Sequence, residues 1–109
     1  MEKFVKGDVI VIPFPFSDLS NAKKRPALIA ANLPGDDTIL CQITSKASDQ
    51  LSIPLHNSDF ERGSLKIKSN IRPNKLFTAD TSIVLYKLGH LKKSKIKETQ
   101  NKIIAMFRS

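Results

Sequence analysis

Short apolar runs rich in β-branched residues recur along most of this sequence, and each is closed by proline, glycine or polar turn residues. The first run, residues 9–12, is nearly continuous, which predicts a strand buried on both of its faces. Because proline cannot donate to a sheet ladder, we expect Pro13 to end this strand. Phe14 and Phe16 should then leave the sheet and begin a loop.

Similar runs follow, separated by turn residues about every ten positions. Residues 34–37 are typical of a hairpin turn, and they separate apolar runs at 26–31 and 38–43. A strand at 51–55 is expected at a sheet edge, because Pro54 limits its pairing. We further expect a polar loop at 56–63, strands at 65–68, 76–78 and 83–86, and a break at 70–74.

Only the end of the sequence has a helical pattern. Apolar residues recur there at the spacing of one face of a 3.6-residue helical period, with lysines elsewhere. These residues are Ile96, Ile103, Ile104 and Phe107. Roughly six or seven short strands and one terminal helix are typical of a mainly β fold with minor α content. We therefore expect residues 1–109 to form a single domain, a small SH3-like antiparallel barrel with a C-terminal helix.

The charge of the chain is strongly positive. The 109 residues include 18 Lys and Arg against 10 Asp and Glu, a net charge of +8, and most of the excess lies at residues 87–109. Such a balance favours polyanionic partners, nucleic acid first, although a lysine face that only keeps the protein soluble is the alternative. No apolar run could span a bilayer or serve as a signal peptide, so we expect a cytoplasmic protein without a membrane partner.

Most enzyme classes have signatures that this sequence lacks, among them the phosphate-binding loop, the dinucleotide fingerprint and the nucleophile elbow. His56 and His90 are isolated, which favours surface or capping roles over catalysis. A single cysteine, Cys41, excludes an intrachain disulfide and a cysteine-based zinc site, and its apolar neighbours favour a buried strand residue over a nucleophile. The carboxylates have no metal-ligand spacing, so we expect neither a metal nor a cofactor.

Polar residues gather where the expected strands begin and end. Residues 23–25 precede one strand, residues 44–46 follow another, and residues 69–75 follow a third. Arginine offers paired donors for phosphate oxygens, and a Ser or Thr hydroxyl adds a neutral donor. Loops held by a rigid sheet are also where functional groups usually lie. These segments indicate a phosphate-binding face, with ordinary solvated loops as the alternative.

Several motifs in this order resemble the MazF/PemK family of toxin endoribonucleases. They are GDVIVIPF at residues 7–14, KRPALI at residues 24–29 and ITS at residues 43–45. PFPFSD at residues 13–18 and IRPNKLFTAD at residues 71–80 are similar to one branch of that family. The resemblance covers residues 6–107, and it depends on the order and spacing of the motifs rather than on any one of them.

The resemblance implies a fold, an activity and partners. It implies the toxin of a type II toxin-antitoxin system, a homodimeric barrel of the MazF, CcdB and Kid type that cleaves single-stranded RNA without a metal ion. A cognate antitoxin peptide laid across the same face neutralises such toxins. The 2′-hydroxyl of the RNA attacks the adjacent phosphorus, which leaves a 2′,3′-cyclic phosphate and a 5′-hydroxyl. A second hypothesis is a non-catalytic binding protein on this fold, either a CcdB-like topoisomerase poison or a toxin that only binds RNA or its antitoxin.

Site residues also follow from the resemblance. Arg25 matches the family's catalytic arginine before proline, and Thr44 matches the hydroxyl that stabilises the transition state. Arg72 matches an arginine that Kid-like toxins use as general acid. We expect Arg25 and Arg72 to clamp the scissile phosphate while Thr44 donates to a nonbridging oxygen. The remaining candidates for substrate contact are Asp18, Lys24, Ser45, Lys46, Asn74 and Lys75.

One position departs from the family pattern. Where Kid-like toxins have an aspartate two residues after the arginine, this chain has Asn74, which cannot act as a base. Arginine has a pKa above about 12, so Arg25 would need an unusual environment to accept a proton. Asp18, in the first loop, is the candidate proton acceptor that the sequence offers.

Overall fold

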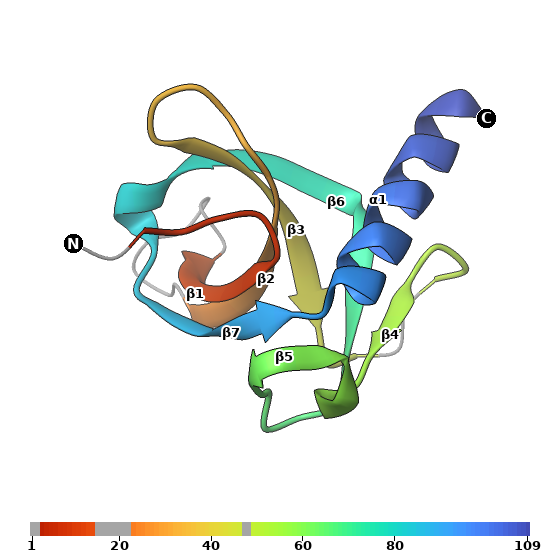
Figure 1. The fold of residues 1–109 in the computed structure, drawn as a ribbon, viewed down its shortest axis with the longest axis horizontal. Helices are drawn as coiled ribbons and strands as arrows, with labels where there is room; N and C mark the ends of the chain where they lie inside the picture. Colours follow the sequence, from red (N-terminus) through yellow and green to blue (C-terminus); the bar gives the residue numbers. More distant parts are fainter. Residues whose placement is uncertain (1–2, 15–22, 47–48) are drawn as a thin grey trace.

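A bent antiparallel sheet and a C-terminal helix make up the described part of the protein. The computed structural model describes residues 3–14, 23–46 and 49–109. Within these ranges, seven strands form one sheet in the order β4-β6-β3-β2-β1-β7-β5 (Figure 1). The strands are β1 (Asp8–Phe14), β2 (Lys23–Asn32), β3 (Asp37–Thr44), β4 (Ile53–Leu55), β5 (Phe60–Gly63), β6 (Ser69–Asp80) and β7 (Tyr86–Leu91). Two 3-10 turns, η2 (Asn57–Asp59) and η3 (Thr81–Ile83), and the helix α1 (Lys93–Arg108) complete this part.

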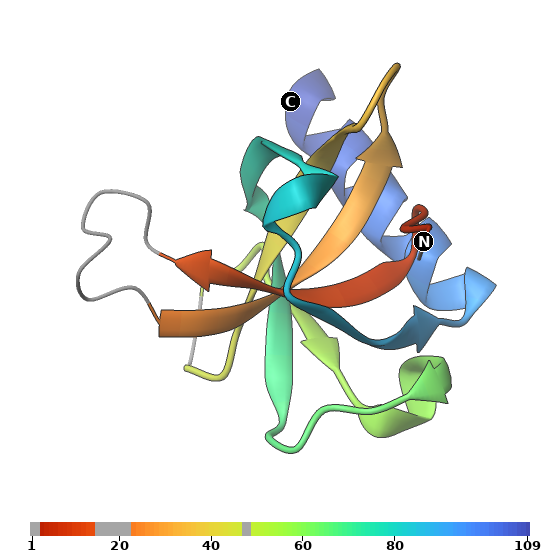
Figure 2. The same cartoon turned by 90° about the vertical axis from the view of Figure 1, so that its left-hand side faces the viewer.

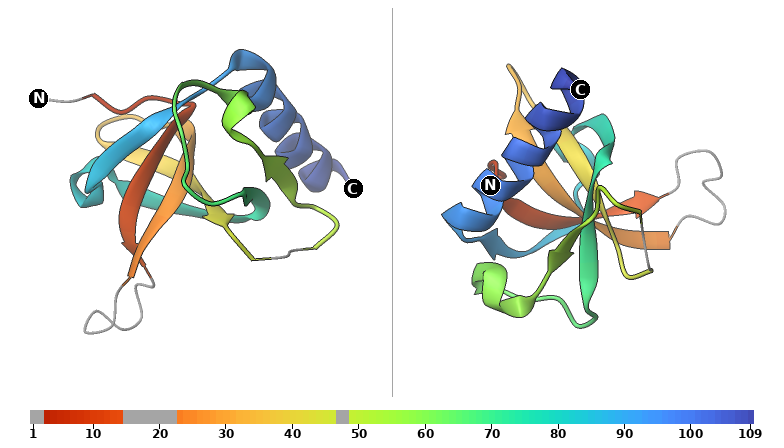
Figure 3. Two further views of the ribbon diagram at one scale, coloured as in Figure 1. Left: turned by 90° about the horizontal axis from the view of Figure 1, so that it is seen from below. Right: turned by 90° about the vertical axis from the view of Figure 1, so that its right-hand side faces the viewer.

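The sheet curls toward a barrel. β4 pairs with the beginning of β6, and β5 pairs with β7, so these two short strands form the edges. Figures 1 and 3 show both edge strands on the same side of the molecule, with the longer strands curving away from them. The predicted mainly β, barrel-like antiparallel fold with a C-terminal helix is thereby confirmed.

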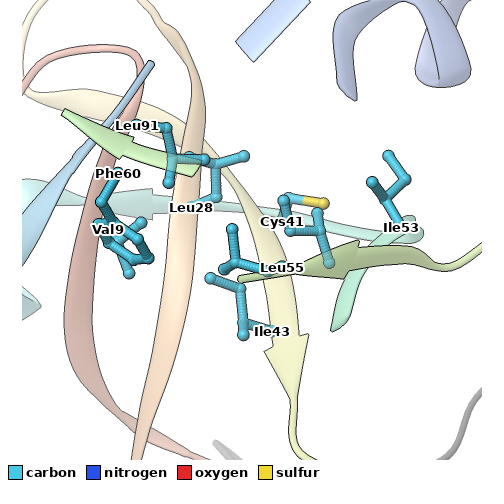
Figure 4. Packing of buried hydrophobic residues seen from close by; sticks show 9 residues of the cluster. Val9, Leu28, Cys41, Ile43, Ile53, Leu55, Phe60 and Leu91 are labelled. Atoms are coloured by element: carbon cyan, nitrogen blue, oxygen red, sulfur yellow. The ribbon is translucent and has the colours of Figure 1, made fainter. Parts of the chain in front are cut away.

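β1 is buried on both faces, as its β-branched residues predict, since residues 9–12 are at most 4% exposed. Two hydrophobic clusters cover the two faces. The first, drawn in Figure 4, consists of Val9, Leu28, Cys41, Ile43, Ile53, Leu55, Phe60, Ile71 and Leu91. The second consists of Ile10, Ile12, Ala27, Ile29 and Leu40. Each fully buried aliphatic side chain contributes about 1.5–3 kcal/mol, so the central strands are held firmly from both sides.

The prediction that Pro13 ends β1 is wrong, because the strand continues to Phe14. β7 pairs with β1 only as far as Val11, whereas β2 pairs with it through Pro13 and Phe14. The strand therefore has one neighbour at this point, and a proline costs no ladder bond on the open side. Phe16 lies outside the described residues.

β6 is one long strand where the sequence predicts a break at 70–74 and a short strand at 76–78. It runs from Ser69 to Asp80, pairing with β4 at its start and with β3 over most of its length. The predicted break is wrong, because it assumes that a proline inside a run must end the strand. Residues 76–78 are in a strand as predicted, but as part of the longer β6.

A bulge in β6 accommodates Pro73. Cys41 and Gln42 are adjacent in β3, yet they face Leu76 and Arg72 of β6. The residues between Arg72 and Leu76 are therefore extra on the β6 side. Extra residues of this kind interrupt the ladder, bend the strand and turn side chains in new directions. Proline is tolerated at such a place because the interrupted ladder does not need its missing N–H.

The segment between β4 and β6 also differs from its prediction. Residues 56–63, predicted as a loop, contain η2 and β5, and residues 65–68, predicted as a strand, form none. Phe60 accounts for β5, because its side chain is 6% exposed in the first cluster and holds this strand against β7. Ile67 is 64% exposed, so the alternation at 65–68 does not follow a buried face.

The strand predicted at 83–86 begins only at its last residue, Tyr86, where β7 starts. The chain before it forms η3, which Asp80 caps by accepting a hydrogen bond from the Ser82 N–H at 2.8 Å. Such a side-chain bond offers the backbone an alternative to a ladder. The apolar pattern of this segment contains no sign of that competition.

The predicted C-terminal helix is confirmed as α1, which packs against β6 and β2 (Figure 3). Ile96 and Ile103 are half-buried, but Ile104 and Phe107 are 45% and 75% exposed. The apolar stripe of the helix is thus wider than the surface that it covers. No helix in the described ranges is both long and apolar enough to cross a bilayer.

Candidate active site

The three residues expected to act on a phosphate lie at one end of the neighbouring strands β2, β3 and β6. Gln42 of β3 faces Arg72 of β6, and two residues further along β3, Thr44 faces Asn70. Continuing the β2–β3 register beyond its last pair brings Arg25 opposite Thr44. Residues that face each other in an antiparallel sheet, and residues two apart in one strand, point to the same side. Arg25, Thr44 and Arg72 therefore share one face of the sheet.

Arg25 lies where β1 and β2 leave the core. It faces Ile12, which is 1% exposed, and is itself half-buried, whereas Lys24 beyond it is exposed. Figure 2 shows these two strands extending together to one end of the molecule. An arginine at such a boundary can keep its aliphatic stem against the sheet and its charge at the surface. This position suits an anion that approaches the sheet from its end.

Thr44 closes β3 with a nearly buried side chain, 9% exposed. Its Oγ1 accepts a hydrogen bond from the Lys46 N–H at 3.2 Å, and the Asn70 amide donates to the Lys46 carbonyl at 3.5 Å. These two bonds fix the turn that follows the strand. A hydroxyl that accepts one bond can still donate its own hydrogen, so Thr44 can serve a bound anion.

A carboxylate joins the two candidate side chains of β6. Asp49 Oδ2 accepts hydrogen bonds from Arg72 Nη2 at 3.4 Å and from Asn74 Nδ2 at 3.1 Å. Its Oδ1 accepts from the Leu51 N–H at 3.0 Å and from Ser52 Oγ at 3.4 Å. The Leu51 N–H is the largest cause of a lowered Asp49 pKa, and the two β6 side chains lower that pKa further. Asp49 is consequently an anion at neutral pH.

Arg72 keeps donors that its contact with Asp49 does not use. Its side chain is 24% exposed, and its Nε is buried without a hydrogen-bond partner among the described residues. The Asn74 Oδ1 is likewise buried and unpartnered within this part of the chain. Buried polar atoms without partners are rare in native proteins and often mark places where a ligand or water completes the bonding.

Cys41 holds the β6 bulge from the core side. Its Sγ is 3.0 Å from the Arg72 carbonyl oxygen, to which the thiol donates, and the residue is fully buried in the first cluster. Burial raises the pKa of the Cys41 thiol to about 12. A thiol that remains protonated is not a nucleophile. The residue acts as a strand residue that fixes the backbone behind Arg72.

The structure gathers only part of the predicted substrate-binding set. Asn74 lies beside Arg72 through their common partner. Ser45 and Lys46 are exposed just beyond the end of β3, and Lys75 is exposed in the bulge of β6. Asp18 lies outside the described residues. Over the residues that the structure does describe, no three His, Cys, Asp or Glu side chains are placed to hold a metal ion.

Sequence reasoning missed Asp49. The one available signal is local, because an aspartate that bonds the N–H two residues ahead is typical of a turn. That signal predicts a turn at Asp49, and it contains nothing about the arginine on a distant strand. The missing information is the path of the chain between β3 and β4.

A second charged cluster lies at the opposite end of β1. Asp8 is fully buried, with Oδ1 2.7 Å from His90 Nδ1 and Oδ2 3.3 Å from Lys87 Nζ, and it accepts a bond from the Val5 N–H at 2.9 Å. His90, isolated in sequence, is therefore paired in space. Asp8 is four residues from Ile12, or about 13 Å along a strand, so this cluster is separate from the arginine site.

Solved structures with a similar fold include MazF toxins and an endoribonuclease. A MazE–MazF complex from Deinococcus radiodurans superposes with a TM-score of 0.75 at 16% identity, covering 94% of both chains. An endoribonuclease in complex with its cognate antitoxin, from a mycobacterial species, gives a TM-score of 0.70 at 14% identity, covering 97% of this chain and 93% of that one. The Mycobacterium tuberculosis toxin MazF-mt6 gives 0.67 at 16% identity, covering 91% and 96%. At these identities the likeness establishes the shared fold.

The sequence itself carries the family relationship. No curated protein sequence matches the chain. A model of the PemK-like, MazF-like toxins of type II toxin-antitoxin systems, in contrast, matches residues 5–107. That range includes every described strand and nearly all of α1. The chain belongs to the PemK-like, MazF-like toxin family of type II toxin-antitoxin systems.

Proposed function

We propose that this protein is a metal-independent, sequence-selective endoribonuclease that cleaves single-stranded mRNA in the cytoplasm. The supporting observation is the common face of Arg25, Thr44 and Arg72 at one end of the sheet. Two arginines and a hydroxyl suit a phosphodiester, because guanidinium groups bind phosphate oxygens in pairs and the hydroxyl adds a neutral donor. A net charge of +8 attracts RNA to the protein.

In the proposed reaction the RNA supplies its own nucleophile. Arg25 and Arg72 hold the nonbridging oxygens of the scissile phosphate while the 2′-hydroxyl attacks the phosphorus. Thr44 donates to the oxygen on which negative charge grows, and Arg72 gives a proton to the departing 5′-oxygen. These side chains can stabilise the growing charge and protonate the leaving oxygen, and the 2′-hydroxyl proton needs a separate acceptor. The products are a 2′,3′-cyclic phosphate and a 5′-hydroxyl.

We also propose a homodimer and an antitoxin peptide as partners. An apolar groove of about 390 Å³ lies between α1 and the sheet, and the exposed Ile104 and Phe107 form part of its wall. Exposed apolar patches of this kind are typical of protein interfaces. The similar endoribonuclease from a mycobacterial species is in complex with its cognate antitoxin. We expect the antitoxin to cover the arginine face as well.

The test is cleavage of a long unstructured RNA in EDTA, followed by analysis of the fragment ends. Wild type should give discrete fragments with cyclic phosphate or 3′-phosphate and 5′-hydroxyl ends. Arg25→Ala should slow cleavage at least about a hundredfold, the scale of losing one transition-state donor. Arg62→Ala is the matched control, because this exposed arginine of β5 pairs with the neighbouring Glu61 and its loss removes the same charge. Equal rates for the Arg25 variant and wild type would contradict the assignment.

One observation favours a second candidate function, a non-catalytic protein that binds RNA or an antitoxin. Asn74, which is not a base, follows Arg72 where Kid-like toxins have an aspartate. Intact RNA after incubation with folded wild type, together with retained RNA binding, would support this function instead.

A further inference from the structure

We propose that the carboxylate of Asp49 accepts the proton of the attacking 2′-hydroxyl, an assignment that rests on the proposed ribonuclease function. The reaction needs a proton acceptor close to the scissile phosphate. Asn74 has no basic group, and an arginine that starts out protonated has no site to accept a further proton. The acceptor must therefore come from another segment, and the structure brings Asp49 into direct contact with Arg72.

The two oxygens of Asp49 have different surroundings. Oδ1 is fixed within its own turn by the Leu51 N–H and Ser52 Oγ. Oδ2 faces β6, 3.1 Å from the Asn74 amide and 3.4 Å from the Arg72 guanidinium. One oxygen thus anchors the carboxylate, while the other is directed to the arginine that binds the phosphate.

Asn74 has an orienting role in this arrangement. Its amide can donate to Oδ2 whether or not a phosphate occupies Arg72, because the Asn74–Asp49 bond does not involve the guanidinium. A phosphate oxygen bound to Arg72 would lie about 3 Å from the guanidinium that Asp49 also contacts, so the carboxylate lies next to the phosphate site. The asparagine that departs from the family pattern therefore positions a carboxylate supplied by the β3–β4 connection.

No other carboxylate in the described ranges is placed for this task, since none forms a hydrogen bond or ion pair with Arg25, Thr44 or Arg72. Asp8 is buried with Lys87 and His90 at the other end of β1. The remaining described carboxylates bond elsewhere or are exposed on other parts of the surface: Asp36, Asp37, Asp59, Glu61, Asp80 and Glu98.

The proposed step conserves atoms and charge. Asp49 takes the proton from the 2′-oxygen as the bond from that oxygen to phosphorus forms. The bond from phosphorus to the 5′-oxygen breaks, and the leaving oxygen receives a proton from Arg72. When the product leaves and the Arg72–Asp49 contact re-forms, the proton on Asp49 passes to Arg72, which restores both groups. The 2′-hydroxyl proton has in effect moved to the 5′-oxygen, so no co-reactant is needed.

The ionisation of Asp49 fits this task. Its hydrogen bonds, that of the Leu51 N–H above all, keep the pKa of Asp49 below the ordinary value of 3.8, so the base form is present at neutral pH. A bound phosphate brings a second negative charge and draws Arg72 toward itself. Both changes disfavour the carboxylate anion and make it a stronger base when substrate is in place.

The experiment compares Asp49→Asn with wild type in two measurements. The first is the single-turnover rate of cleavage of an RNA containing the recognised sequence. The second is the affinity for the same oligonucleotide with a 2′-deoxy substitution at the cleaved position, which binds but cannot react. We expect the rate to fall at least about a hundredfold, the usual contribution of a general base. Affinity should stay equal or increase, because a negative charge beside the phosphate has been removed.

Two variants complete the design. Asp36→Asn makes the same charge change on an exposed turn remote from the arginines, and it should cleave like wild type. Asp49→Glu keeps a carboxylate and should recover part of the lost rate, which guards against a folding defect in the asparagine variant.

Two results for Asp49→Asn would overturn the proposal, and a third result would refute the ribonuclease function. A rate for Asp49→Asn within about threefold of wild type would overturn the proposal, given the hundredfold expected of a base. A loss of rate matched by an equal loss of affinity would overturn it too, because Asp49 would then only position Arg72 for binding. Both results leave the ribonuclease function intact if Arg25→Ala still slows cleavage as expected. A wild type that does not cleave RNA would instead refute the proposed function itself.

Discussion

Arg72 and Asp49 form an ion pair that a substrate must rearrange. The side chains are 24% and 43% exposed, and the distance between the charged atoms is 3.4 Å. Ion pairs this exposed are weak and are screened by salt. A phosphate, which offers several oxygens to one guanidinium, can therefore take over Arg72 without a large opposing free energy. The contact sets the guanidinium in place beforehand and does not block it.

The Asp49 carboxyl should titrate below its ordinary pKa of 3.8 in the free protein. Arg72→Ala should raise this pKa only in part, because the Leu51 N–H, the larger cause of the shift, is unaffected. Since the folded-state pKa is lowered, the contribution of Asp49 to stability is present above 3.8 and is lost as the pH falls through the lowered value. Carboxyl ¹³C chemical shifts followed against pH measure both quantities.

Arg62→Ala is the control for that titration, because it removes an arginine that lies in β5 and pairs with its neighbour Glu61 instead of Asp49. It should leave the Asp49 curve unchanged. A pKa of Asp49 above 3.8 in wild type, or an unchanged pKa in Arg72→Ala, would contradict these hydrogen bonds.

At the scale of elements, the strands near the N-terminus and the terminal helix could be predicted, because their apolar residues follow the buried surface of each element. β1 is the clearest case, since its unbroken β-branched run corresponds to burial on both sides. The family resemblance also singled out Arg25, Thr44 and Arg72, and the ladder places these three residues on one face, while their roles in catalysis stay a prediction.

β6 and the β3–β4 connection could not be predicted in the same way. A rule that proline ends a strand is local, whereas the bulge at Pro73 depends on pairing with β3 and on the Cys41 thiol behind it. The position of Asp49 depends equally on the path of a turn through space. Both features arise from contacts between segments distant in sequence, and neither leaves a periodic trace.

Lys95 connects α1 with β4 and η2 through polar contacts. Its Nζ lies 2.9 Å from Glu98 Oε1 and 3.6 Å from Asp59 Oδ2, and it donates to the Pro54 carbonyl at 3.2 Å. Its side chain is only 12% exposed. Lys95→Met keeps the aliphatic stem and removes these bonds. We expect the free energy of unfolding to fall by about 1–2 kcal/mol.

Lys97→Met is the matched variant for that measurement, because it makes the same change at an exposed position of the same helix. Surface substitutions of this kind usually stay within about 0.5 kcal/mol. Urea denaturation of both variants gives the comparison. Equal effects would mean that the contacts of Lys95 with β4 and η2 do not hold the helix.

At the scale of the whole molecule, the arginine site and the apolar groove lie on different surfaces. The arginine site lies at the strand ends of β2, β3 and β6, whereas the apolar groove lies between α1 and those strands. An isolated monomer with Phe107 75% exposed would present an apolar helix end to water. With a net charge of +8, copies of the chain repel one another, so self-association must rest on apolar contact.

Sedimentation should therefore give twice the chain mass of 12.2 kDa at micromolar concentration for wild type. Phe107→Glu should shift the protein to the monomer, because a charge in the groove loses its hydration when a second copy covers it. Ile67→Glu is the control, since this residue is 64% exposed and does not line the groove. It should remain dimeric. A wild type that sediments as a stable monomer would refute the dimer, and dimers in both variants would assign the dimer interface to another surface and leave the groove for the antitoxin.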